Sequence, residues 1–240
     1  IGDFATADNA EAFEAIAVAV AGAALMIIAT GVASYLIDEK SSQENVARLQ
    51  YMALNDTLTG LPNRASFTDH LASRLDRART RGGRLAVLCI DLDRFKEIND
   101  QRGHDAGDRA LTIIGRRFAE LLNPGEFVAR IGGDEFAAVK SYEAAEDVHD
   151  FVSRLETALV DPLEIGNFST VTGGSIGIAL YPEDGADADR LVLNADLAMY
   201  RAKQDADRSI CFYEQRMDEA ARRRNSLATD LRLALSRGEF

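Results

Sequence analysis

The sequence lacks tryptophan and is poor in cysteine, histidine and proline: its 240 residues include no Trp, two Cys, three His and four Pro. The two cysteines, Cys89 and Cys211, show neither CxxC nor metal-ligand spacing, which excludes a cysteine-based metal site. Each lies in an apolar run, so we expect buried, reduced thiols, as in a cytoplasmic domain. Internal repeats and low-complexity tracts are missing as well.

The chain is also short of positive charge. It has 27 Lys and Arg against 39 Asp and Glu, a formal net charge of -12 and a pI of about 4.8. Nonspecific nucleic-acid binding depends on Lys and Arg that neutralise phosphates, so we expect no nucleic-acid partner. A single bound nucleotide is still compatible with this charge, because metal ions and a few basic residues offset it locally.

A glycine pair, Gly132 and Gly133, separates two short strand-like runs. This pattern predicts a hairpin, because glycine adopts positive φ at low cost at both turn positions. Asp134 and Glu135 follow the pair, and strand alternation points them to opposite faces. Bare backbone beside two carboxylates suits a ligand that carries phosphates and a metal. An ordinary hairpin with surface acids is the alternative.

A second pair of acids follows an apolar stretch. Residues 85–90 are apolar and partly β-branched, which predicts a buried strand, and Asp91 and Asp93 come directly after it. Acids at a strand end beside an acid-bearing hairpin predict a divalent-metal site. Mg²⁺ suits it, because this ion usually takes one or two carboxylates together with substrate phosphates.

Between residues 56 and 214 the sequence alternates helical and strand patterns, which indicates an α+β fold with helices packed on a sheet. We expect helices at 64–79, 105–122, 144–159 and 188–206, and strands at 85–90, 126–131, 136–140, 171–180 and 210–213.

Upstream of this region the sequence predicts a membrane attachment. No charge interrupts residues 15–37, and their length meets the roughly 20 apolar residues that a bilayer span needs. A buried soluble helix is the alternative. Acids in the flank 1–14 and basic residues after the run favour a cytoplasmic location for the domain C-terminal to it. The missing initial Met suggests further spans, and residues 38–55 are expected to form a helical linker.

Several motifs occur together in one order. Residues 132–136 read Gly-Gly-Asp-Glu-Phe, and four other stretches, 56–64, 91–108, 175–179 and 194–203, carry matching signatures. Over 56–214 the chain thereby resembles a GGDEF-family diguanylate cyclase domain. The resemblance implies a ferredoxin-like core, similar to the palm of polymerases and nucleotidyl cyclases.

The resemblance also implies a reaction, in which two GTP molecules condense to cyclic di-GMP and release pyrophosphate. Asp91, Asp134 and the backbone carbonyl of Leu92 would hold Mg²⁺ or Mn²⁺. Glu135 would assist the metal or take the proton from the attacking hydroxyl. The signature glycines would leave space for ribose and phosphates.

Other matching positions would bind the nucleotide. Lys96, the backbone at Phe95, and Lys203 would meet the phosphates, whereas Asn99 and Asp108 would form hydrogen bonds with guanine. A carboxylate accepts from the two N–H groups of the guanine edge, and adenine lacks that pair.

Two departures from the family pattern matter. Ala206 and Asp207 stand where the family usually has Gly and Arg, and Arg208 comes one residue late. An acid beside phosphates would weaken GTP binding unless Arg208 compensates for it. Asn123 and Glu126 replace the Arg and Asp of the inhibitory product site found in many members. A neutral amide does not replace the charged fork of arginine, so we expect no inhibitory product site.

The resemblance implies partners as well. A domain that holds one GTP needs a second copy, so we expect a homodimer, located at the inner membrane of a bacterium with the catalytic domain in the cytoplasm. Residues 215–240 resemble the start of an EAL phosphodiesterase domain, with a solvated C-terminal helix as the alternative. A GTP-binding module that regulates an attached EAL domain is the competing function.

Overall fold

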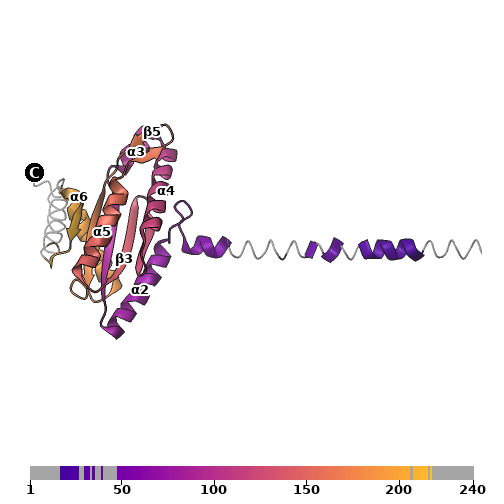
Figure 1. Cartoon of the computed structure of the whole chain (residues 1–240), viewed down its shortest axis with the longest axis horizontal. Helices are drawn as coiled ribbons and strands as arrows, with labels where there is room; N and C mark the ends of the chain where they lie inside the picture. Colours follow the sequence, from indigo (N-terminus) through magenta and orange to yellow (C-terminus); the bar gives the residue numbers. More distant parts are fainter. Residues whose placement is uncertain are drawn as a thin grey trace, which may run out of the picture. The chain divides into compact units, whose positions relative to one another are not determined.

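The computed structural model describes residues 17–26, 30–32, 34–35, 39, 48–205, 208–215 and 217 (Figure 1). The chain divides into two units, Ile1–Tyr51 and Met52–Phe240. In the first unit residues 17–26 are helical with exposed side chains. Among the described residues no helix is long and apolar enough to cross a membrane. The structure therefore does not support the span expected over 15–37.

The second unit is built on a five-stranded sheet in the order β2-β3-β1-β6-β7. The strands are β1 (Arg84–Leu92), β2 (Glu126–Gly132), β3 (Glu135–Tyr142), β6 (Gly174–Tyr181) and β7 (Ile210–Phe212). The pairs β1–β3, β1–β6 and β2–β3 are antiparallel, and β6–β7 is parallel. The central position of β1 buries it on both faces, which explains its almost continuous apolar sequence.

Helices cover both faces of this sheet. They are α2 (Arg64–Arg81), α3 (Phe95–Arg102), α4 (His104–Leu121), α5 (Ala145–Val160) and α6 (Ala188–Gln204). Residues Leu88 and Ile90 of β1 pack with α4 and α5 in one core, whereas Leu85 and Val87 pack with α2 and α6 in the other. Alternate residues of β1 thus face the two cores. The expected α+β fold with helices flanking a sheet is confirmed, and the sheet is mixed.

Local signals set the helix ends. The Asn63 side chain accepts a hydrogen bond from the Ser66 backbone N–H at the start of α2 (3.1 Å), and Gly82 ends the helix at φ 72°. The Asp187 carboxylate accepts one from the Arg190 N–H at the start of α6 (2.8 Å). Both N-caps satisfy backbone donors that a helix leaves unpaired.

Four elements differ from the sequence-based expectation. Helix α3 and the small hairpin of β4 (Leu163–Ile165) and β5 (Phe168–Thr170) were not expected, and β6 begins at Gly174 rather than at residue 171. α3 is only 8 residues long, and its apolar side chains are Phe95 and Ile98, which are partly buried against the core. One apolar pair is too short a pattern to predict a helix. The segment 215–240, for which an EAL-like start is expected, lies outside the described residues apart from 215 and 217.

Candidate functional site

Asp91 lies at the C-terminal end of the central strand, between two neighbours. In the register of the sheet it is opposite Glu135 on β3 and opposite Ser175 on β6. Asp91 is only 7 % exposed. A carboxylate at this depth needs a partner, and α6 supplies one.

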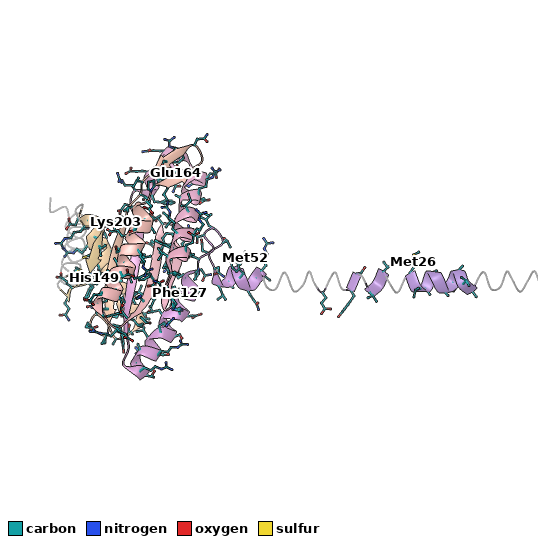
Figure 2. The ribbon with its side chains drawn as sticks, viewed as in Figure 1. Met26, Met52, Phe127, His149, Glu164 and Lys203 are labelled. Carbon is teal, nitrogen blue, oxygen red and sulfur yellow. The ribbon has the colours of Figure 1, made fainter. Side chains whose placement is uncertain are left out.

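Lys203 of α6 is the direct partner of Asp91. Its Nζ lies 2.6 Å from Asp91 Oδ1, and the residue is labelled in Figure 2. Burial raises the pKa of Asp91 above its usual value; Lys203 opposes this, and the charges of Asp134 and Asp93 add to it. The hydrogen bond to Asp91 raises the pKa of Lys203. One ammonium therefore does not offset the three carboxylates.

The signature hairpin brings Asp134 to Asp91. The Leu92 N–H donates to the Asp134 carbonyl at 3.2 Å. Gly132 and Gly133 have φ of 150° and 56°, and a side chain at either would meet open space. The turn is at Gly133 and Asp134, with Gly132 ending β2 after a bulge. The prediction of a Gly-Gly turn is thus off by one residue, whereas positive φ at both glycines is confirmed.

An ion pair that sequence reasoning missed holds this turn in place. Arg130 donates to the Gly133 carbonyl through Nε (3.1 Å) and Nη2 (2.8 Å), and through Nη1 to Asp56 Oδ1 (2.9 Å). Asp56 Oδ1 also accepts from the Thr59 N–H and hydroxyl. Asp56 and Arg130 are 74 residues apart in the chain, so no short-range pattern links them.

Helix α3 presents its N-terminus directly after β1. Arg94, at φ 56°, precedes it, and among the described residues no side chain caps its first backbone N–H groups. Such a terminus favours anions, phosphates among them. Phe95 and Lys96 begin this helix, which is where the sequence predicts phosphate contacts.

The two predicted guanine contacts lie on neighbouring helices. A side chain at Gly107 of α4 would come within 2.1 Å of Asn99 Oδ1 and 3.1 Å of the Phe95 ring. The Asn99 amide of α3 thus packs over the bare backbone that precedes Asp108. Asp108 itself is exposed.

The donor set fits a magnesium ion, although the described residues contain no cluster of three or more His, Cys, Asp and Glu arranged as metal ligands. Two carboxylates with a backbone carbonyl are enough for Mg²⁺, which completes its shell with water and phosphate oxygens. Burial, and after it the charges of Asp134 and Asp93, raise the pKa of Asp91, and a cation bound beside this carboxylate would oppose both effects.

Glu126 is enclosed in a network of its own. Its side chain is fully buried; Lys140 Nζ lies 2.7 Å from Oε1 and the Asn123 N–H 2.7 Å from Oε2. Arg154 donates to both carboxylate oxygens, at 2.5 and 3.1 Å. Burial alone would raise the pKa of Glu126, but these hydrogen bonds hold it below the usual value. No oxygen of this carboxylate is left to bind a ligand.

We therefore expect cyclic di-GMP to inhibit this domain weakly or not at all through Asn123 and Glu126, because one is neutral and the other is already paired. Product titrated into a cyclase assay measures this. Tight noncompetitive inhibition that disappears when Asn123 or Glu126 is mutated would contradict the prediction.

The departure from the family pattern at Ala206 and Asp207 lies outside the described residues, so its weakening effect on GTP binding stays a prediction.

Comparison with known proteins gives a family match. The model of the family "Diguanylate cyclase, GGDEF domain" matches residues 53–209. Diguanylate cyclase TpbB of Pseudomonas aeruginosa is 43 % identical over 178 residues, which are 71 % of this chain and 41 % of that protein. The GGDEF domain of TpbB has a solved structure with 38 % identity and a TM-score of 0.67, covering 70 % of this chain and 99 % of that one.

Relatives with another activity match as well. Cyclic di-GMP phosphodiesterase NbdA of P. aeruginosa is 35 % identical over 189 residues, 79 % of this chain and 24 % of that protein. The chain spans only about a quarter of the length of the first curated relatives that it matches. With most of the described domain inside the family match and the signature hairpin beside Asp91, the chain belongs to the GGDEF family of diguanylate cyclase domains.

Proposed function

We propose that this domain is an active diguanylate cyclase that condenses two GTP molecules into cyclic di-GMP and releases pyrophosphate. The observation that carries the proposal is the cluster of Asp91, Asp134 and Lys203 at the end of the central strand. Phosphoryl transfer needs little covalent chemistry from a protein; it needs positioning and neutralised charge. Carboxylates for a metal and a lysine for phosphates meet both needs.

Asp91, Asp134 and the Leu92 carbonyl would hold the metal. A bound Mg²⁺ or Mn²⁺ would stabilise charge on the phosphoryl group and activate the attacking hydroxyl. Glu135, opposite Asp91 in the sheet, would take the hydroxyl proton or assist the metal. The open space at Gly132 and Gly133 would admit ribose and phosphates.

The remaining residues would position GTP. The uncapped N-terminus of α3 at Phe95 and Lys96 would bind the terminal phosphates. Asn99 and Asp108 would read the guanine edge. Lys203 would pair with Asp91 in the absence of nucleotide and with the phosphates in its presence. Because one domain binds one GTP, two copies would face each other as a homodimer.

A second function is worth testing because relatives include a phosphodiesterase. In that alternative the domain binds GTP and regulates an attached EAL domain without making product. Incubation of the purified chain with GTP and Mg²⁺, followed by chromatography of the nucleotides, separates the two. Cyclic di-GMP in the products supports the cyclase; bound GTP without product supports the regulatory module.

Lys203→Met should raise the KM for GTP, by about tenfold, because a partly exposed ammonium near phosphates contributes on the order of 1 kcal/mol. Steady-state kinetics with the cyclase assay measure this, with the exposed Lys96→Met as a comparison at the other predicted phosphate contact. An unchanged KM in Lys203→Met would mean that this lysine serves only Asp91.

Location at the bacterial inner membrane, with the domain in the cytoplasm, stays a prediction.

A further inference from the structure

A cavity of about 400 Å³ opens between α2 and α6, beneath the end of the sheet that carries Glu135. Its walls are apolar and come from both helices and from three strands: Phe67, Leu71, Ile131, Val192 and Met199 take part. The volume is within the range of small-molecule sites. None of the residues proposed for GTP or metal binding lines it, apart from Glu135.

Charged side chains surround the cavity. Arg64, Glu135, Asp189 and Asp196 line it, and within the described part of the chain none of these charged groups forms a hydrogen bond or an ion pair. Three of them lie near Cys89, since the charges of Asp196, Glu135 and Arg64 all influence the pKa of its half-buried thiol. The cavity is therefore lined by three carboxylates and one guanidinium, which leaves an excess of negative charge.

We propose that this cavity binds a small aromatic cation, and that its occupation inhibits the domain. The apolar walls suit a flat hydrophobic body, and the excess of unpaired carboxylates selects a positive group over a neutral or negative one. The inhibitory part rests on the proposed function: a cation paired with Glu135 removes that carboxylate from the reaction.

Methionine methyl NMR tests binding directly, because Met199 lines the cavity and Met52 does not. Benzamidine is the probe, and benzamide is its neutral counterpart of nearly equal shape. We expect benzamidine to shift the Met199 methyl signal in a saturable way while Met52 stays unchanged. Benzamide should bind about tenfold more weakly, as expected for the loss of a charged hydrogen-bonding group. Absence of a Met199 shift, or equal binding of the two probes, overturns the proposal.

Asp189→Asn and Asp196→Asn should each weaken benzamidine about fivefold, the scale of a partly exposed charge pair. Asp100→Asn removes an exposed carboxylate from α3, outside the cavity, and should not change binding. Val192→Trp fills the cavity and should abolish the Met199 shift. If the aspartate variants bind as tightly as the wild type, the cation is not recognised here and the assignment fails.

An activity assay separates this proposal from the proposed function. Benzamidine should lower the rate of cyclic di-GMP formation without competing with GTP, and Asp189→Asn should need about fivefold more of it. Binding without inhibition overturns the regulatory part. A protein that makes no cyclic di-GMP even without benzamidine contradicts the proposed function instead, and the NMR titration still decides the cavity.

Discussion

Asp134→Asn is expected to abolish the formation of cyclic di-GMP and to leave the fold intact. Within the described residues the Asp134 carboxylate has no hydrogen-bond or ion-pair partner, and its carbonyl, which accepts from the Leu92 N–H, is retained by asparagine. The charge of Asp134 raises the pKa of Asp91 and also that of Lys203, so its removal relieves one repulsion and weakens one attraction. The two effects oppose each other, and stability should change little.

The loss of activity should be large. A metal ligand that acts on developing phosphoryl charge contributes several kcal/mol, so we expect a fall of about a thousandfold in kcat. Product formation by chromatography gives the rate, and a thermal unfolding curve verifies the fold. Asp100→Asn, which makes the same change on an exposed face of α3, is the matched control and should retain the wild-type rate.

Two results would contradict this prediction in different ways. Persistent turnover in Asp134→Asn removes Asp134 from the mechanism and assigns the metal to Asp91 and other ligands. A markedly lowered melting temperature would mean that the carboxylate has a structural partner. Only loss of product with a nearly unchanged melting temperature supports the assigned role.

The local parts of the site were predictable from sequence. In the sequence Asp91 follows an apolar run, and Asp134 follows a glycine pair. Each pattern is short-range, and the structure brings the two residues together through neighbouring strands. Lys203 was assigned by resemblance to bind phosphates, and the structure adds its ion pair with Asp91. The apolar run of β1 correctly predicted a buried strand.

The long-range parts were not predictable. The examples are the ion pair of Arg130 with Asp56 and the network around Glu126. In the sequence these charged residues look like ordinary exposed surface residues. Such contacts depend on how strands are ordered in the sheet, and the strand order is not contained in the periodicity of any one segment. For the predicted membrane span, a local pattern was present but the expected element was not found. The apolar run 15–37 meets the length criterion for a span, yet no described helix is long and apolar enough to cross a membrane.

Gly177 is a residue whose importance appears only in three dimensions. It lies on β6, opposite Cys89 of β1. A Cβ at this position would lie 2.0 Å from the backbone nitrogen of Met199 and 2.1 Å from the carbonyl oxygen of Ala195. Both belong to α6, so the backbone of this helix rests directly on the strand. In the sequence this residue is only a glycine in an apolar strand. Such a glycine indicates that another group approaches the strand closely, but it does not identify that group.

Gly177→Ala should therefore destabilise the domain strongly. Non-bonded carbon contacts are normally about 3.5 Å or longer, so α6 has to move away from the sheet, and it is helix backbone rather than a flexible side chain that is displaced. Overpacking of this kind costs about 3 kcal/mol. For a domain of this size we expect the melting temperature to fall by roughly 6–12 °C. Thermal unfolding followed by circular dichroism measures it.

Gly83→Ala is the matched control for the same chemical change. A Cβ there would lie 3.4 Å from the Ala78 Cα, an ordinary contact, so its stability should change by less than about 1 kcal/mol and can rise. Because α6 also carries Lys203, Gly177→Ala should in addition raise the KM for GTP, whereas Gly83→Ala should not. Equal melting temperatures for the two variants would contradict this prediction. They would mean that α6 moves away from β6 without a loss of stability, and that the close contact of α6 with β6 does not hold Lys203 at Asp91.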